Sequence, residues 1–359
     1  MNPPLKTSTP NPASEIDEIK LPDGFKISVY ARVKNARAMT MSANGILYVG
    51  SRKEGKVYAV VDSNQDGKAD EVTIVAENLH YPTGVTWHQD RLYVSEVSRI
   101  LLFDSIDHVY RKKPSYRIFP YTFPSEEHHG WKFIRIGPDG YLYVPVGAPC
   151  NICLRNDDPR FASIMRISLN GKNSEIIAHG VRNTVGFDWN PMSGTFWFTD
   201  NGRDWMGDDL PPCELNVLKK KGNHFGFPYC HGNQIQDPDY GKKASCDTFI
   251  SPAMMLGPHV APLGMRFYNH TRFPKKYHNG IFIAEHGSWN RTKPIGYRIT
   301  FVPVHQDEAL GYEVFASGWL RSDGSRWGRP TDVLVTPQGD LLISDDYGDA
   351  IYRITYSHP

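Results

Sequence analysis

One short stretch of the chain decides the fold, and it reads DGYLYVPVG at residues 139–147. A turn leads directly into a run of aromatic and β-branched residues, which is typical of a β-strand that leaves a tight turn. A second apolar run, KFIRI (132–136), comes before it, and a third, IMRIS (164–168), follows it. The three runs predict an antiparallel β-meander.

The same pattern recurs along the chain. Its other copies are NGILYVG (44–50), DRLYVSE (90–96), SGTFWFTD (193–200), NGIFIAE (279–285) and GDLLISD (339–345). Each copy has an apolar run in front of it, and the copies lie about 45 to 60 residues apart, except after the fourth, which is followed by a longer segment; this spacing is the size of a propeller blade. We therefore predict an all-β fold, a six-bladed β-propeller of four-stranded antiparallel blades.

The repeat also sets the domain organisation. We expect a flexible tail or a wrapping strand at residues 1–20, and a single propeller domain at residues 21–359. The fourth unit carries an insertion at about 205–255, which we expect to form a loop or lid near the mouth of the functional site. No long segment of period 3.6 competes with this interpretation.

The composition fits a globular protein with many turns, since 40% of the residues are hydrophobic and there are 31 Gly and 27 Pro. A net charge of +1 gives no indication of nucleic acid or an anionic membrane as a partner. No apolar run approaches the ~20 residues of a membrane span. The polar, proline-rich start lacks the apolar core of a signal peptide, so an export signal was either removed or never present. We expect a periplasmic or secreted protein.

The five cysteines indicate disulfides more than metal binding. Cys150 and Cys153 form a lone CxxC without a second CxxC or a following His, so a local disulfide or two ordinary thiols is favoured over a zinc or haem site. Cys230 and Cys246 flank a polar loop that they could close, and such pairing would imply an oxidising compartment. Cys213 has no evident partner.

A second possible metal site begins at Asp62. Together with Asn64, Asp66 and Gly67 it matches the start of an EF-hand calcium loop, but position twelve is Thr73 instead of Glu. The segment joins strands, not helices. A plain acidic turn is the favoured interpretation, and a short calcium loop is the alternative.

Blade topology brings certain residues to one face. In a meander the first strand crosses the sheet and the second returns, so residues before the first strand and after the second lie at the same mouth of the channel. The residues just before the first strands are Arg37, Pro82, His129, Arg182, Asn183, His259 and Arg329, and the loops after the second strands begin with Arg52, Glu96, Gly147, Asp200, Glu285 and Asp345. Arginines and histidines at the axis predict a polyanionic ligand. The alternative is that each is a satisfied turn residue.

Several longer stretches resemble a known family. They are HGWKFIRIGPDGYLYVPVGAPCN (129–151), GVRNTVGFDWNP (180–191), ELNVLKKKGNHFGFPYCHG (214–232), LGPHVAPLGMRFY (256–268) and EHGSWNRTKPIGYR (285–298). Together they are similar to the soluble sugar dehydrogenases that use pyrroloquinoline quinone, the glucose/sorbosone dehydrogenase family. The resemblance extends over residues 21–356 and implies a six-bladed propeller, in agreement with the repeat count.

The resemblance implies roles for particular residues. His129 stands where the family places its general base, whereas His128 matches no functional position. Arg182 and Asn183 match the pair that contacts the reactive quinone oxygen. Two backbone carbonyls that hold calcium correspond to Gly202 and Arg203.

Other cofactor contacts follow in the same way. His259 and Arg329 match positions that line the cofactor, and Arg291 and Lys293 are further candidate cations for its carboxylates. Arg37 is added from the repeat geometry alone.

The chemistry of the cofactor explains these residue types. Three carboxylates and an ortho-quinone require fixed cations, and guanidinium groups suit carboxylates well. Calcium accepts oxygen ligands and polarises the quinone, while a neutral imidazole takes the proton of a sugar hydroxyl as hydride moves to the quinone. The resemblance therefore implies a quinoprotein that oxidises an aldose or related sugar and passes electrons to an external acceptor, such as a quinone, a dye or a cytochrome.

The chain departs from the family at some positions. The glucose-oxidising members have an aspartate that supports the histidine, and Ala148 stands in its place; Glu126, Glu127 or a backbone carbonyl are the candidates to orient His129. Cys213 stands where an aspartate commonly precedes a glutamate. These changes favour the sorbosone-like or broad aldose branch.

Two other functions fit a six-bladed propeller. A calcium-dependent lactonase-type hydrolase requires carboxylate and amide ligands that converge on the axis, and the cationic ring disfavours it. A non-catalytic propeller would bind proteins or glycans, and its histidines and arginines would be incidental.

Overall fold

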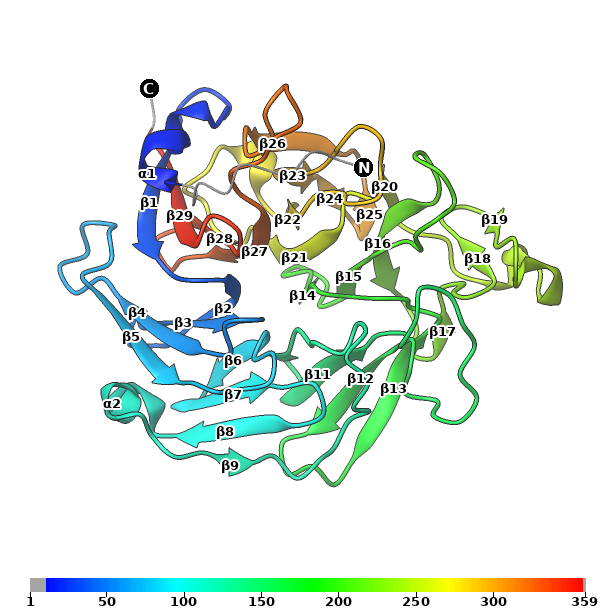
Figure 1. Cartoon of the computed structure of the whole chain (residues 1–359), viewed down its shortest axis with the longest axis horizontal. Helices are drawn as coiled ribbons and strands as arrows, with labels where there is room; N and C mark the ends of the chain where they lie inside the picture. Colours follow the sequence, from blue (N-terminus) through cyan, green and yellow to red (C-terminus); the bar gives the residue numbers. More distant parts are fainter. Residues whose placement is uncertain (1–10, 358–359) are drawn as a thin grey trace.

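The computed structural model describes residues 11–357, in which six main sheets of antiparallel blade strands are arranged around a central axis (Figure 1). The predicted six-bladed propeller is confirmed. The first blade contains β2 (Ala36–Met41), β3 (Leu47–Ser51), β4 (Val57–Val61) and β5 (Glu71–Ala76). The second contains β6 (Val85–His88), β7 (Arg91–Ser95), β8 (Ile100–Asp104) and β9 (Arg117–Ile118). The third contains β10 (Arg135–Ile136), β11 (Tyr141–Val146), β12 (Ser163–Ser168) and β13 (Ser174–His179).

The last three blades follow in chain order. The fourth blade contains β14 (Phe187–Trp189), β15 (Phe196–Asp200), β16 (Pro212–Leu218) and β20 (Met254–Pro258). The fifth contains β21 (Pro262–Phe267), β22 (Ile281–Glu285), β23 (Arg298–Val302) and β26 (Glu313–Ser317). The sixth contains β27 (Pro330–Val335), β28 (Leu341–Asp345), β29 (Ala350–Tyr356) and β1 (Phe25–Arg32). Two β-strands, β24 (Val304–His305) and β25 (Glu308–Ala309), pair outside the blades. The short helical segments outside the insertion are α1 (Pro12–Glu15), η1 (Ile16–Glu18), α2 (Ile106–Val109), η2 (Tyr110–Lys112) and η5 (Lys275–Tyr277).

The ring closes through β1. This N-terminal strand pairs antiparallel with β29, from Phe25 opposite Tyr356 to Arg32 opposite Ala350, so the sixth blade combines both ends of the described chain. Residues 1–10 of the expected tail lie outside the described residues. Residues 11–20 form α1 and η1, and Lys20 exchanges backbone hydrogen bonds with Ser317 of the fifth blade.

The insertion of the fourth blade begins later than the sequence suggested. The expected range of 205–255 includes β16, which is the third strand of that blade, so the extra segment is 219–253. It contains β17 (Asn223–His224), β18 (Cys230–His231), β19 (Ile235–Gln236), η3 (Gly241–Lys243) and η4 (Cys246–Thr248). Strand β17 adds a fifth, parallel strand to the third blade, and β18 and β19 lie at the outer rim (Figure 1).

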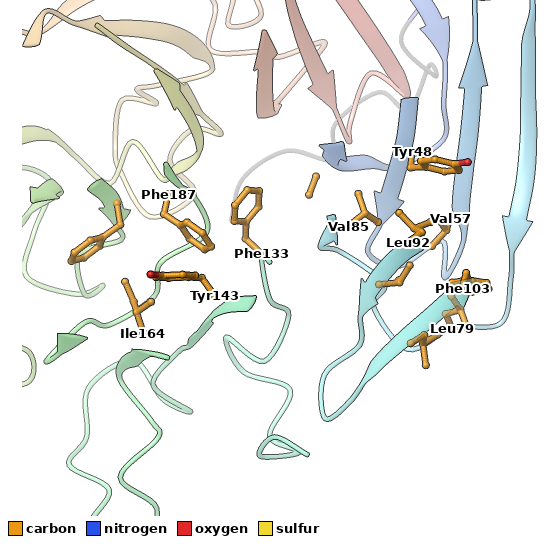
Figure 2. Close-up of a cluster of buried hydrophobic side chains, with 14 of the residues drawn as sticks. Tyr48, Val57, Leu79, Val85, Leu92, Phe103, Phe133, Tyr143, Ile164 and Phe187 are labelled. Carbon is orange, nitrogen blue, oxygen red and sulfur yellow. The ribbon is translucent and has the colours of Figure 1, made fainter. Parts of the chain in front are cut away.

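The hydrophobic core lies between neighbouring blades. Figure 2 shows one cluster, in which the rings of Phe133 and Phe187 meet edge to face at a centroid distance of 5.0 Å and Tyr143 packs beside them. Aromatic pairs in such geometry add stability beyond the area that they bury. Blades fixed in this way hold the loops at the two ends of the channel in place. Among the described residues, no helix has the length and apolar character needed to cross a bilayer.

Candidate functional site

A cavity of about 330 Å³ opens at one mouth of the central channel. It brings together most of the residues that the sequence singled out, namely Arg37, His129, Arg182, Asn183, Gly202, His259 and Arg329. The far ends of the same inner strands line a larger cavity of about 570 Å³ at the opposite mouth. The larger cavity contains none of the predicted site residues, so the smaller one is the candidate site.

His129 is buried and held in a single orientation. Its Nδ1 lies 2.8 Å from the carbonyl oxygen of Ala148. Because a carbonyl only accepts, Nδ1 carries the proton and Nε2 is left as the basic nitrogen. Nε2 has no hydrogen-bond partner among residues 11–357. The backbone of His129 has a φ of 52°, in the left-handed region, which histidine adopts more readily than most other residues with a side chain.

The surroundings keep the His129 imidazole neutral. Burial, followed by the nearby charge of Arg182, lowers the pKa of His129 well below its ordinary value of 6.5. Of the three candidates to orient the ring, the backbone carbonyl does so: Glu126 pairs with Arg155 at 3.2 Å and Glu127 lies 2.9 Å from His80. His129 therefore has the protonation state that a base requires.

His128 lies beside His129, with 4.1 Å between the ring centroids, and also lines the cavity. It is exposed, and no hydrogen bond within the described part of the chain orients its ring. The structure thus distinguishes the two adjacent histidines, since one is fixed and buried and the other is not.

Arg182 is buried and its guanidinium is already held by protein groups. Nε donates to the carbonyl of Asn151 at 2.8 Å, Nη2 donates to Asn151 Oδ1 at 2.9 Å, and Nη2 lies 3.3 Å from a carboxylate oxygen of Asp204. The backbone N–H groups of Arg182 and Asn183 both donate to the buried carboxyl of Asp200. These contacts fix the pair rigidly at the cavity wall.

Arg37 and Arg329 come from opposite ends of the chain and meet around Asp346. Arg37 Nη1 lies 2.9 Å from Asp346, and the imidazole of His286 donates to the same carboxylate at 2.8 Å. Arg329 donates to the carbonyls of His286 and Gly287, both at 3.0 Å. Burial, the main cause, and the positive charge of Arg329, the second, lower the pKa of His286 to about 3, so this imidazole is neutral.

Arg52 differs from the other cavity arginines. Its guanidinium lies over the ring of Trp131 at 3.7 Å and near that of Tyr81 at 5.6 Å, and its buried Nε has no hydrogen-bond partner in the described part of the chain. Burial, followed by repulsion from Arg37, lowers its pKa to about 10, which leaves it charged at neutral pH. The sequence placed Arg52 at the correct mouth by topology, but no motif identified it as a site residue.

The two residues predicted to hold calcium point in different directions. Gly202 lines the cavity, whereas the side chain of Arg203 turns outward to Asp237 at 2.5 Å and Asp239 at 3.1 Å, both in the insertion. This contact brings the insertion close to the site. The predicted calcium ligands are backbone carbonyls. Within residues 11–357, no group of three or more His, Cys, Asp or Glu side chains is arranged to hold a metal ion.

Two predicted cofactor cations do not reach the cavity. Arg291 lies 3.2 Å from Asp209 at the surface, and Lys293 is exposed. Neither is among the cavity-lining residues. His259 does line the cavity, and its Nε2 donates to the carbonyl of Gly207 at 2.8 Å.

The mouth of the cavity has an aromatic wall that the sequence did not indicate. Trp289 is 64% exposed and meets Trp205, which is 69% exposed, edge to face at 5.3 Å. Beside them, Asn290 donates to Asp204 at 2.9 Å, while its buried Oδ1 has no partner among the described residues. Large exposed aromatic rings at the rim of a polar cavity are suited to packing against a ligand.

A buried carboxyl, Glu214, lies behind the site. It accepts hydrogen bonds from the N–H of Gly232 at 2.7 Å and from Asn216 at 3.0 Å, and no cation pairs with it in the described structure. Burial, followed by repulsion from Asp200, raises its pKa to about 8. Its neighbour Cys213 is a buried free thiol.

The remaining cysteines form two disulfides, Cys150–Cys153 and Cys230–Cys246. The EF-hand-like segment forms a turn between β4 and β5. Its Asp62 accepts the N–H of Gly67, Asp66 accepts the N–H of Lys68, and Asp70 accepts the N–H of Ser63, so these carboxylates are bonded within the same turn.

Residues 19–357 match the TrAA12-like family, so the chain belongs to this family. An uncharacterized protein of Borreliella burgdorferi is 34% identical over 94% of the chain and 91% of its own length. The pyrroloquinoline quinone-dependent pyranose dehydrogenase of Coprinopsis cinerea is 21% identical over 80% of the chain, and the match spans 45% of that relative. The calcium structure of the Trichoderma reesei Carbohydrate-Active Enzymes Family AA12 protein superposes with a TM-score of 0.83 at 17% identity, covering 99% of each chain. At this identity the likeness shows a shared fold.

Proposed function

We propose that the protein is a pyrroloquinoline quinone-dependent dehydrogenase that oxidises an aldose or related sugar of the sorbosone or glucose type. The observation that carries the proposal is the neutral, oriented His129 with a free Nε2 in a cavity lined by Arg37, Arg52, Arg182 and Arg329. Membership of the TrAA12-like family and the activity named for the Coprinopsis relative support it.

The residues present fit the cofactor. Its carboxylates require cations, and Arg52 lines the cavity without a carboxylate partner in the described part of the chain, while Arg37 and Arg329 supply charge nearby. Arg182 and Asn183 lie on the wall next to His129 and would face the quinone oxygens. The backbone carbonyls of Gly202 and Arg203 would hold the calcium ion, which binds oxygen ligands of this kind. When bound, the quinone supplies the hydride acceptor.

The protein supplies the base. Nε2 of His129 would accept the proton of the sugar hydroxyl, and Nδ1 stays bonded to Ala148 so that the ring keeps its orientation. The positive charge of Arg182 nearby disfavours a lasting imidazolium, which promotes release of the proton after each turnover. Trp205 and Trp289 at the mouth would pack against the sugar and narrow the entrance to water.

Two disulfides support an exported protein, since such bonds persist in oxidising compartments. We place the enzyme in the periplasm or outside the cell, where it would pass electrons to an external quinone, dye or cytochrome. A lactonase would require free carboxylates at the axis. The cavity carboxylate Asp204 is instead paired with Arg182, and Asp346, behind the wall, is paired with Arg37.

Dye reduction tests the proposal. The purified chain is mixed with calcium and pyrroloquinoline quinone, and reduction of an artificial electron acceptor is followed with a panel of aldoses and with sorbosone. We expect reduction that requires both the quinone and a sugar. Hydrolysis of sugar lactones without the quinone would favour the lactonase instead, and no quinone binding at all would contradict the proposal.

A further inference from the structure

A short segment after β11 connects three parts of the cavity. Ala148 donates its N–H to the carbonyl of Arg182 at 2.8 Å and accepts the Nδ1–H of His129 at 2.8 Å. Gly147 packs directly against His129, because an added Cβ would lie 2.7 Å from the His129 Cβ. The segment therefore contacts both the candidate base and the neighbouring arginine.

Asn151 extends this contact to the loop of Asp204. Its carbonyl and its Oδ1 both accept from the guanidinium of Arg182, at 2.8 Å and 2.9 Å. The same Oδ1 accepts the N–H of Asp204 at 2.8 Å, and Nδ2 donates to the Asp204 carbonyl at 3.1 Å. One amide side chain thus uses both its donor and its acceptor to join the third and fourth blades.

A disulfide closes the chain around Asn151. Cys150 and Cys153 flank it within a ring of four residues. The segment that follows β11 is irregular up to β12, so no sheet hydrogen bonds hold Asn151 in position. A covalent link across the loop reduces the conformations open to Asn151 before any ligand binds.

We propose that Asn151 is a positioning residue, which fixes Arg182 against the Asp204 loop and beside His129, and that the Cys150–Cys153 disulfide holds Asn151 in this pose. The expected effect of Asn151 on cofactor binding rests on the proposed function. The expected effect of Asn151 on the cavity of the cofactor-free protein does not depend on that function. Asn151→Ala keeps the backbone carbonyl that accepts from Nε of Arg182 but removes the Oδ1 that accepts from its Nη2, so the buried guanidinium moves to find another acceptor.

The pKa of the His129 ring depends on the position of Arg182, so a titration of this ring detects a movement of Arg182. The charged or titratable groups that face His129 are Arg182, His128 and Arg52, and Arg182 is the strongest of these influences. In Asn151→Ala, Arg182 pairs more closely with Asp204, and its repulsion of a protonated His129 weakens. We expect the pKa of His129 to move up toward 6.5.

The experiment uses the folded, cofactor-free chain. Histidine ring signals are followed by NMR from pH 4 to 8, and the His129 signal is assigned from its loss in His129→Gln. Asn151→Ala should shift the His129 titration upward, whereas Asn151→Gln, which keeps a neutral side-chain amide, should shift it less than the alanine variant does. Asn170→Ala is the matched control, since Asn170 makes comparable bonds within a turn of the same blade.

A second readout is quinone affinity in the presence of calcium. Asn151→Ala should weaken it about tenfold, and Asn151→Gln, which adds no charge, should lose less affinity than the alanine variant. The double variant Cys150→Ser/Cys153→Ser should change both readouts in the same direction by less, and Cys230→Ser/Cys246→Ser should change neither.

An unchanged His129 titration in Asn151→Ala, with quinone affinity like that of Asn170→Ala, would overturn the inference. If Asn151→Ala does not fold, the His129 titration and the quinone affinity are measured in Asn151→Ser and in the Cys150→Ser/Cys153→Ser variant, and unchanged values there would likewise overturn the inference. A wild-type protein that binds no quinone would refute the proposed function, while the titration would still test the role of Asn151.

Discussion

The carbonyl oxygen of Ala148 accepts the Nδ1 proton of His129 at 2.8 Å, in place of the side-chain carboxylate that a histidine base commonly has. A carbonyl fixes the tautomer and the orientation of the ring as a carboxylate does. It lacks the negative charge that would stabilise an imidazolium, so burial and Arg182 dominate and lower the pKa of His129. Nε2 of His129 is therefore free to accept a proton at a lower pH than an ordinary histidine is.

This relationship predicts the pH dependence of the activity. Only the neutral imidazole accepts a proton, and its pKa lies well below 6.5. Activity should rise with pH in a limb that lies below 6.5 and should be level from there to neutral pH. The measurement is kcat/KM for one aldose between pH 4 and 8. An acid limb centred at or above 6.5 would show that His129 is not protected from protonation.

Arg52 should be the cavity arginine that contributes most directly to the affinity for the quinone. Arg52→Leu removes an unpaired charge without leaving a protein carboxylate or carbonyl unsatisfied, so we expect a loss of about ten- to a hundredfold in quinone affinity with little loss of stability. Arg52→Lys should recover part of it, because it restores the charge but not the planar group over Trp131.

The measurement for Arg52 is titration of the apoprotein with quinone and calcium. Arg111→Leu serves as a control, since Arg111 is exposed and pairs with Glu71 at 2.6 Å. If Arg52→Leu bound the quinone as tightly as the control, the cofactor carboxylates would have to contact other cations.

Much of the fold follows from the sequence, because each blade repeats a turn and apolar runs of fixed order. The closure of the ring by β1 does not follow from the sequence, because its partner β29 lies more than 300 residues away and no local pattern identifies the pairing. The start of the insertion was misplaced for a similar reason. PCELNVL becomes a blade strand through its pairing with β15, whereas the sequence pattern only marked an unusually long unit.

The candidate site, like the fold, follows from the sequence only in part. Meander topology brings residues before the first strands to one mouth, which is why His129, Arg182 and Arg329 line one cavity. Arg291 and Lys293 were placed by a gapped resemblance within a loop, and a loop conformation does not follow from spacing. The groups that hold the arginines, such as Asp346 for Arg37, are distant in sequence and emerge only from the folded chain.

Glu214 predicts a pH-dependent change in stability. The folded-state pKa of about 8 lies above the ordinary 4.5, so the folded protein retains a proton that the unfolded chain releases, and stability falls as pH rises between these values. Glu214→Gln removes this penalty. The variant should gain roughly 3 kcal/mol over wild type at pH 7 and less than about 1 kcal/mol at pH 5.

Urea denaturation at the two pH values measures the effect. The amide of Asn216 is able to flip and offer its unpaired Oδ1 to the new side chain, so the substitution leaves no added unsatisfied donor. Glu313→Gln, at an exposed position on β26, should show no such pH dependence. An equal effect of Glu214→Gln at both pH values would mean that Glu214 is ionised in the folded protein.

Phe187 should be a major contributor to core stability. Its ring is fully buried and contacts Phe133, Trp189 and Phe196. Phe187→Ala should lower the free energy of unfolding by about 3–5 kcal/mol, because it leaves a cavity between blades that cannot easily collapse. Met192→Ala, at a position 77% exposed, should change it by less than about 0.5 kcal/mol. Comparable urea midpoints for the two variants would contradict this packing.

Reduction of the bound quinone in a single turnover tests whether this cavity is the catalytic site and His129 its base. Protein loaded with quinone and calcium is mixed anaerobically with an aldose, and the quinone absorbance is followed for wild type, His129→Gln and His128→Gln. We expect all three to bind the quinone, His128→Gln to react nearly as fast as wild type, and His129→Gln to react about 10²–10⁴-fold more slowly. Equal rates for wild type and loaded His129→Gln, or loss of reaction in His128→Gln alone, would show that the base is elsewhere.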